Sequence, residues 1–432
     1  MTVIEYSIPL FFLLIGAELV YAQARGTRLL RLNDSISNIS LGTLSQLSAL
    51  LFKIFTIGIY AWVADRLAIQ RFVPAVPSWI GGAPFHAVAA FPWIGVRLPE
   101  LISWAAVFVL VDLAYYWSHR MSHEVHLLWA GHVVHHSSEE YNLAVALRQS
   151  SLHGLMTWVF YVPLALVGVP VTMFVVCYGL NLVYQFWIHT RAVGRLNSLT
   201  ELVLNTPSHH RVHHGVNPEY QDRNYAGVLI VWDRVFGTFT AEEEEPVYGI
   251  THPLASWNPL WANVHVFVDI WRISSSTRGW RNKLKVVFGP PSWRPADVGP
   301  QLIPDQSPID NFRKFDPQVP GSWTLYAFAQ FVFTVAAGIG VLVIASTLTV
   351  PQAAALVFYL ALSLTNVGGL LEGERWSIVL ELARLLSLSA AGVTLLLTSN
   401  VSRVPIVLAL IWFLISALWL RRVAAQTNPT PP

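Results

Sequence analysis

Three short segments of the chain carry closely spaced histidines. They are residues 119–123 (HRMSH), 132–136 (HVVHH) and 210–214 (HRVHH), and a further histidine, His189, ends an apolar stretch. Side chains three or four positions apart share one face of a helix, so each segment can direct two or three imidazoles to one point. Because imidazole nitrogens bind metal ions, the pattern predicts a metal site. Thiolates are not expected in it, since the chain has one cysteine, Cys177, within an apolar run.

The number of histidines predicts two metal ions. The three segments and His189 contribute nine predicted ligands: His119, His123, His132, His135, His136, His189, His210, His213 and His214. Neutral imidazoles suit iron, zinc, copper and nickel, and a structural zinc ion takes four ligands, so nine are too many for one ion. Zinc has no redox chemistry, whereas a histidine site beside lipid, with no evident nucleophile–base pair, suits activation of O₂ by iron. The spacing by itself does not separate iron from zinc.

The segments around the histidines are apolar enough to cross a membrane. Of the 432 residues, 54% are hydrophobic and 12% are charged, whereas a soluble domain has roughly 25% charged residues. The stretch 152–188 is interrupted at 168–170 (GVP) and predicts a helical hairpin. Apolar runs near the spanning length of ~20 residues lie at about 6–24, 42–64, 100–118, 323–346, 352–371, 376–397 and 403–420. The sequence therefore predicts an all-α, polytopic integral membrane helical bundle.

The distribution of basic residues predicts how this bundle is oriented. The segment 189–321 is richer in charge, proline and glycine and is predicted to lie outside the membrane. Basic residues follow the first span, occur in this segment and follow the last span: Arg25, Arg28, Arg31, Arg278, Arg281, Lys283, Lys285, Arg421 and Arg422. Because cytoplasmic loops carry an excess of arginine and lysine, this face is predicted to be cytoplasmic. The histidine segments fall on the same face, which favours a dinuclear catalytic site there over metal transport through the spans.

Two simpler readings of the chain are disfavoured. The first apolar run has no basic segment before it, so it predicts a membrane helix rather than a cleaved signal peptide. The net charge of +2, without a basic stripe, predicts no nucleic-acid partner.

The histidine segments resemble those of the fatty acid hydroxylase/sterol desaturase superfamily over residues 100–240, and Asp112, Tyr115 and Arg120 fit that pattern. A closer similarity, over about residues 100–300, is to the alkylglycerol monooxygenase family. It rests on the strings at 129–150, 184–190, 205–215, 224–239 and 248–253. The four predicted C-terminal spans extend past the common superfamily core, and a C-terminal membrane extension is also a feature of that family. The resemblance implies N-terminal membrane helices over 1–99, a histidine-box catalytic core over 100–300 and a C-terminal four-helix membrane extension over 301–432.

The resemblance also implies an activity. It is that of a membrane di-iron monooxygenase that uses O₂ and tetrahydrobiopterin, with the nine histidines as ligands. Such an enzyme hydroxylates the carbon next to the ether oxygen of an alkylglycerol lipid taken from the bilayer, and yields a fatty aldehyde and a glycerol derivative. The alternative is a sterol or fatty-acyl hydroxylase or desaturase that receives electrons from a ferredoxin or cytochrome partner. The implied location is a bacterial inner membrane, or the endoplasmic reticulum in a eukaryote.

Several further residues are candidates for the site or its support. Glu139 is predicted one helical turn after His136, as an acid near the pterin or as a partner of an imidazole; a surface carboxylate is the alternative. His209 is either a tenth ligand or a donor behind the ligands. Asp112 lies within an apolar run, where an acid needs a partner, and Arg120 or a ligand histidine is the expected one.

Polar residues after the second and third segments are candidates for binding the substrate or supporting the site. Asn142, Arg148 and Gln149 follow the second segment and are candidates for positioning the substrate. Arg148 and Gln149 are predicted to meet a glycerol or phosphate head group, and the alternative for Arg148 is an interfacial arginine that meets lipid phosphate. Asn205 is predicted to support the site or the pterin, as are Asn224 and Tyr225. His126 and His153 remain open between ligand and core, whereas His86, His252 and His265 are expected to be ordinary core histidines.

Overall fold

The computed structural model describes residues 3–73, 98–299, 312–398 and 402–425, and within them it is helical without a β-strand. This confirms the predicted all-α class. The chain divides into two compact units, one of residues 1–254 and 263–313, the other of residues 255–262 and 314–432. The threefold division proposed from the sequence stays a prediction.

Six helices of the described residues are long and apolar enough to cross a membrane, which makes this a multi-pass membrane protein. A seventh, α2 (Leu32–Arg66), joins them if its path, bent by 46°, counts as one span. The six are α1 (Val3–Arg25), α3 (Leu98–Glu124), α14 (Gly321–Ile344), α15 (Val350–Glu372), α16 (Arg375–Thr398) and α17 (Arg403–Ala424). Each coincides with an apolar run predicted from the sequence.

Helix α2 begins ten residues before the predicted start at about residue 42 because its first turns serve the histidine-bearing region rather than lipid. Asp34, Ser37 and Asn38 are buried there. Asp34 accepts hydrogen bonds from Ser138, and Ser37 and Asn38 accept hydrogen bonds from Arg148. Because these residues are polar, the first turns of the helix do not form part of an apolar run in the sequence.

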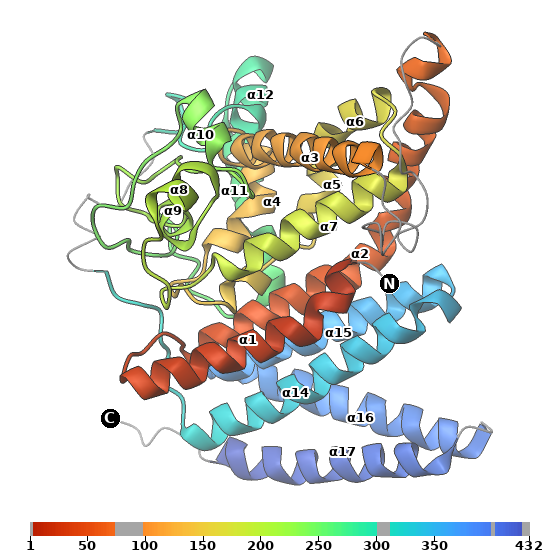
Figure 1. The fold of residues 1–432 in the computed structure, drawn as a ribbon. Coiled ribbons are helices and arrows are strands. Elements are labelled where there is room, and N and C mark those ends of the chain that lie inside the picture. Colours follow the sequence, from red (N-terminus) through yellow and green to blue (C-terminus); the bar gives the residue numbers. More distant parts are fainter. Residues whose placement is uncertain (1–2, 74–97, 300–311, 399–401, 426–432) are drawn as a thin grey trace. The chain divides into compact units, whose positions relative to one another are not determined.

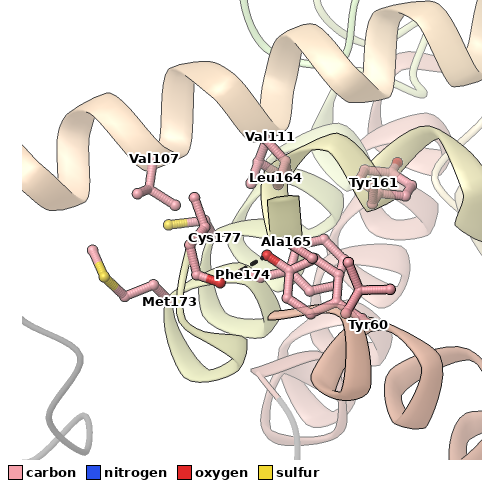
Figure 2. Close-up of a cluster of buried hydrophobic side chains, with 11 residues drawn as sticks. Tyr60, Val107, Val111, Tyr161, Leu164, Ala165, Met173, Phe174 and Cys177 are labelled. Atoms are coloured by element: carbon pink, nitrogen blue, oxygen red, sulfur yellow. Dashed lines mark hydrogen bonds between the residues drawn. The ribbon is translucent and has the colours of Figure 1, made fainter. Parts of the chain in front are cut away.

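The predicted hairpin is confirmed as two helical segments separated at Gly168, whose φ of +74° suits a glycine. The first segment consists of α5 (His153–Thr157), η4 (Trp158–Tyr161) and α6 (Val162–Leu166), and the second is α7 (Val171–Trp187). Figure 2 shows the apolar core in which Tyr60 of α2, Val107 of α3 and Phe174 of α7 meet. The Tyr60 hydroxyl donates to the Val169 carbonyl at 3.0 Å, and Cys177 is buried in the same core.

Shorter helices complete the histidine-bearing unit. Figure 1 shows α8 and α9 beyond the ends of α3 and α7 that lead to the histidines. These helices are α4 (His126–His136), α8 (Ser198–Val203), α9 (Pro207–His213), α10 (Val231–Phe236), α12 (Trp280–Phe288) and, from residue 263 onward, α11 (Pro259–Ser276). Single 3₁₀ turns are η1 (Ile69–Arg71), η3 (Val145–Leu147) and, in the other unit, η5 (Ala345–Thr347).

The second unit contains α14 to α17 and buries a charged pair. The Glu381 carboxylate of α16 accepts two hydrogen bonds from the Arg384 guanidinium, at 2.6 and 2.7 Å. Tyr326 of α14 and Asn366 of α15 also donate to this carboxylate, at 2.6 and 2.7 Å. Gln330 of α14 accepts a hydrogen bond from Arg384 at 2.6 Å. Three helices are thus joined through one buried ion pair.

Candidate metal centre

The nine predicted ligand histidines converge in two adjoining groups. Within each group, the candidate ligand nitrogens all lie within 4.8 Å of one another. The first group consists of His119, His123, His132, His136 and His213, and the second of His135, His189, His210 and His214. All nine are nine-tenths or more buried.

Each histidine segment is helical, and two of the segments serve both groups. His119 and His123 occupy the last turns of α3 and enter the first group. Helix α4 directs His132 and His136 to the first group and His135 to the second. Helix α9 directs His213 to the first group, and sends His210 and the capping His214 to the second. Side chains four positions apart point the same way, whereas a neighbouring residue is turned by about 100°, so one helix supplies both groups.

Backbone carbonyls hold four of the imidazoles through Nδ1. The Nδ1 atoms of His119, His135, His189 and His213 lie 2.7, 3.0, 2.7 and 2.8 Å from the carbonyl oxygens of Tyr225, Arg148, Gln185 and Arg223. A carbonyl only accepts, so each Nδ1 carries the proton and each Nε2 keeps a free lone pair. This is the arrangement that orients a histidine toward a metal ion.

The Nε2 atoms of His135 and His189 face each other at 3.2 Å. Because both rings donate from Nδ1, neither Nε2 carries a proton for the other, and two lone pairs this close repel unless a cation lies between them. Two nitrogens bound to one ion at about 2.1 Å lie about 3.0–3.4 Å apart. The Nε2 atoms of His119 and His132 lie 3.0 Å apart, and those of His132 and His136 lie 3.2 Å apart.

Other buried nitrogens in the groups have no hydrogen-bond partner among the described residues. These atoms are Nε2 of His123, His213 and His214. An unpaired buried polar atom carries an energetic cost, which coordination removes. The donor set therefore fits metal ions.

Burial keeps these imidazoles neutral. Removal from water lowers the pKa of His189 to about 4, and it lowers the pKa values of six others well below the usual range, with help from neighbouring histidines. The six are His132, His135, His136, His210, His213 and His214. A metal ion binds the neutral imidazole, so at neutral pH no proton has to leave before coordination.

An aromatic pair that the sequence analysis did not single out adjoins the second group. The Tyr141 ring lies 5.3 Å from that of His214 and 5.8 Å from that of His189, between ring centroids. Tyr248 stacks on Tyr141 at 4.8 Å, and its buried hydroxyl has no hydrogen-bond partner among the described residues. Tyr248 pairs through its backbone with Gly215, next to His214. This contact joins segments 33 residues apart, so local spacing could not reveal it.

The other candidate histidines lie outside both groups. His209 places Nε2 2.8 Å from a Glu201 carboxylate oxygen, behind the ligand helix α9. His126 places Nδ1 2.9 Å from the Val286 carbonyl oxygen. His153 lies 3.1 Å from the Ser122 hydroxyl, with its ring 4.8 Å from that of His132. His86 lies outside the described residues.

Glu139 differs in position from the prediction. Helix α4 ends at His136, so Glu139 lies in the following loop and not one helical turn further on. Its carboxylate is buried, and one oxygen lies 3.5 Å from an Arg31 guanidinium nitrogen. Arg31 follows α1, and this contact brings the loop between α1 and α2 to the histidine-bearing end of the unit.

The polar residues predicted to position the substrate have partners within the protein. The Arg148 guanidinium is 1% exposed and donates to the Val134 carbonyl and to Ser137, Ser37 and Asn38. It is therefore neither at a head group nor at the membrane interface; its own carbonyl orients His135. Asn142 donates to the Leu29 carbonyl and accepts from the Ala144 amide. Gln149 donates to the Ala146 carbonyl.

Asp112 has partners other than the expected ones. It accepts hydrogen bonds from the amides of Val228 and Leu229, from the Trp232 indole and from Asn181, at 2.6–3.0 Å. Arg120 instead pairs with Glu124 at 2.8 Å. Asn205 donates to the Ala226 carbonyl at 2.6 Å. Together, Asp112 and Asn205 hold the segment that begins at Tyr225, whose carbonyl orients His119.

Comparison with known proteins places this centre in a family. The family model described as fatty acid hydroxylase matches residues 104–238, which include all nine histidines. Alkylglycerol monooxygenase of Xenopus tropicalis is 36% identical over 386 residues, which cover 89% of this chain and 80% of the relative. The Homo sapiens enzyme of that name is 38% identical over 389 residues, 89% of this chain and 81% of the relative. The chain belongs to the alkylglycerol monooxygenase family. A third family member, from Danio rerio, is 36% identical over 88% of this chain and 80% of its own length. No solved structure matches the chain.

Proposed function

We propose that this protein is a membrane monooxygenase that hydroxylates the carbon next to the ether oxygen of alkylglycerol lipids. One oxygen atom of O₂ enters that C–H bond as a hydroxyl group, and the other leaves as water with two electrons and two protons from the donor. The resulting hemiacetal breaks its bond to the ether oxygen and yields a fatty aldehyde and a free glycerol hydroxyl. The observation that carries the proposal is the pair of histidine groups, in a chain that is 36–38% identical to alkylglycerol monooxygenases over most of its length.

The nine histidines are proposed to hold two iron ions, one for each group. Iron bound there would supply the redox chemistry with O₂ that imidazoles and zinc lack. The contribution of the protein is to hold four of the rings through backbone carbonyls, and to lower the pKa values of seven of the imidazoles by burial so that those seven stay neutral. The packed surroundings also exclude water from the reacting atoms.

Tetrahydrobiopterin is the proposed source of the two electrons. A reduced pterin has a flat pyrimidine ring with several N–H groups, from which a carboxylate can accept hydrogen bonds. Glu139 supplies a buried carboxylate three residues after His136, and we assign it to this part of the site. The proposed alternative donor is a ferredoxin or cytochrome that docks from outside.

The site is proposed to face the cytoplasm. The contact between Arg31 and Glu139 supports this, because it places the basic residues that follow α1 on the side of the histidines. Basic residues mark the cytoplasmic ends of spans. A lipid from the adjacent leaflet then reaches the metal ions with its ether bond near the surface and its chain in the bilayer.

The test is turnover by the purified, iron-loaded protein with a 1-O-alkylglycerol, reduced pterin and isotopically labelled O₂. Fatty aldehyde is expected, with the label in its carbonyl oxygen when it is trapped at once by reduction. The glycerol product should carry no label, because the ether oxygen stays with it. Unlabelled aldehyde, or none with iron fully loaded, would contradict the proposal.

The donor is tested by exchange in the same assay. Reduced pterin is expected to support turnover, whereas reduced ferredoxin or cytochrome is not. If the protein carrier supports oxidation of a sterol or fatty-acyl lipid and the pterin does not support ether cleavage, the alternative function is correct. Replacement of iron by zinc should leave the histidine site filled but inactive.

A further inference from the structure

Helix α12 exposes an apolar stripe on a helix that is too short to span a membrane. Trp280, Leu284 and Phe288 recur every fourth residue and are 67%, 48% and 59% exposed. At about 100° per residue they form one face of the helix. Val286 lies on the opposite side and packs against Ala130 of α4 and Ile270 of α11. The helix therefore has one apolar side within the protein and a second one turned outward.

The location of α12 places it level with the end of a span. Its capping residue Gly289 accepts a hydrogen bond from the amide of His126 at 2.9 Å, and His126 follows the end of α3 at Glu124 by two residues. In Figure 1, α12 runs across the direction of α3 and not along it. A helix whose C-terminal end meets the end of a span, and which runs across the direction of that span, lies along the membrane surface.

The charges on α12 identify what the exposed side meets. Arg281, Lys283 and Lys285 flank the apolar stripe on both sides, and the helix contains no acidic residue. Arg278 precedes it, and the Arg278 amide donates to Asp297 at 2.6 Å. An apolar stripe flanked by cations, with an aromatic residue at its start, fits the interface of an anionic leaflet.

We propose that α12 is an interfacial anchor whose stripe of Trp280, Leu284 and Phe288 inserts at the head-group level and whose cations bind anionic phospholipids. The anchor is attached to the metal centre through α4. The carbonyls of Val286 and Gly289 hold His126, and α4 continues from there to His132, His135 and His136. Anchoring of α12 thus fixes the height of these ligands above the leaflet. The anchor does not depend on the chemistry proposed for the site.

The single buried cysteine of the chain makes the test direct. In a Cys177→Ala background, the substitutions Leu284→Cys and Asn282→Cys each accept one environment-sensitive fluorophore. Asn282 is the matched control because it is exposed on the same helix but on the side away from the stripe. The full-length protein is reconstituted into phosphatidylcholine bilayers with and without phosphatidylglycerol, and lipids carry a quencher near the head group.

The fluorophore at position 284 should be quenched by lipid several times more than that at 282, and more strongly when phosphatidylglycerol is present. The pair Arg281→Gln and Lys283→Gln should lower insertion in anionic bilayers by about fivefold for each cation removed. Lys285 is kept because it lies over the Trp293 ring at 4.5 Å. Equal quenching at positions 282 and 284 would overturn the proposal. Protection of the fluorophore at position 284 from both lipid-borne and aqueous quenchers would also overturn it, and would indicate that a protein partner covers the stripe. Equal quenching with and without phosphatidylglycerol would contradict the proposed role of the cations.

Discussion

The metal centre and the buried charge cluster of the C-terminal helices both place polar groups in apolar surroundings, but they satisfy them differently. In the C-terminal cluster the polar groups turn toward one another, and the Glu381 carboxylate meets Arg384, Tyr326 and Asn366. In the metal centre the protons point outward to backbone carbonyls, and lone pairs such as those of His135 and His189 face inward.

The different hydrogen-bonding patterns of the two clusters show how a buried structural cluster can be told from a ligand-binding one. Opposite charges and matched hydrogen bonds leave nothing for a ligand to add, so the C-terminal cluster joins helices. Nitrogen lone pairs that converge without a proton between them create a region of negative electrostatic potential, which a bound cation neutralises. Both regions are buried, so burial does not distinguish them. The direction of the N–H protons does, because it shows whether lone pairs are left to bind a cation.

The strongest test of this contrast is His135→Ala. The substitution removes one of the two facing lone pairs, and we expect metal content of the second group to fall and aldehyde formation to drop by about a thousandfold or more, beyond the loss typical of an outer partner. Metal analysis and product analysis on the same sample measure both. His126→Asn is the matched control, since His126 is a buried histidine of the same helix outside both groups. Normal metal content and turnover in His135→Ala would refute its assignment as a ligand.

The complementary substitution is Arg384→Met in the C-terminal cluster. It leaves the Glu381 carboxylate buried without its cation, which should lower the free energy of unfolding by about 3–5 kcal/mol. Thermal unfolding in detergent measures the loss. Metal content per folded chain should not change. The double substitution Glu381→Gln with Arg384→Met should recover most of the stability, and failure to recover it would argue against a purely structural cluster.

A smaller effect is expected behind the ligands, from Asp112→Asn. An amide cannot accept the four hydrogen bonds that Asp112 receives, so the segment carrying the Tyr225 carbonyl should loosen and His119 should lose its orientation. We expect the affinity for iron to fall about 10- to 100-fold, as for other outer partners of metal ligands. Competition with a chelator measures it, with the exposed Asp65→Asn as control. An unchanged affinity would mean that His119 is held by other contacts.

The smallest effect concerns pH and a histidine that is buried but structural. Burial lowers the pKa of His126 to about 4, whereas an unfolded histidine has a pKa of about 6.5. Between these values the unfolded chain binds a proton that the folded protein does not. The free energy of unfolding should therefore fall as pH decreases, by up to about 1.4 kcal/mol per pH unit.

Replacement by asparagine tests this, because its amide can still donate to the Val286 carbonyl and does not titrate. Melting temperatures of the metal-free proteins should decline less steeply with acidification in His126→Asn than in the unsubstituted chain. Parallel slopes would show that His126 titrates normally in the folded state.

Much of the fold followed from local features of the sequence. A span is visible because its length and hydropathy belong to one continuous segment, and the C-terminal helices α14 to α17 coincide with the predicted runs. The start of α2 was missed because its first residues are polar, and they are polar because a distant arginine, Arg148, needs acceptors. Glu139 was placed on a helix because its spacing from His136 suits one, but α4 ends before it.

The sequence by itself determined which nine histidines come together. Eight of them have ligand spacing within a helical turn, which is a local property, and His189 stands alone at the end of an apolar stretch. The tertiary structure decided how they divide between two groups. It also decided that Arg148 and Asp112 serve the protein's own backbone rather than a lipid or Arg120. Some of these contacts join residues more than a hundred positions apart in the sequence, and their geometry arises only when several helices pack together. A spacing rule that applies within one helix therefore cannot predict this geometry.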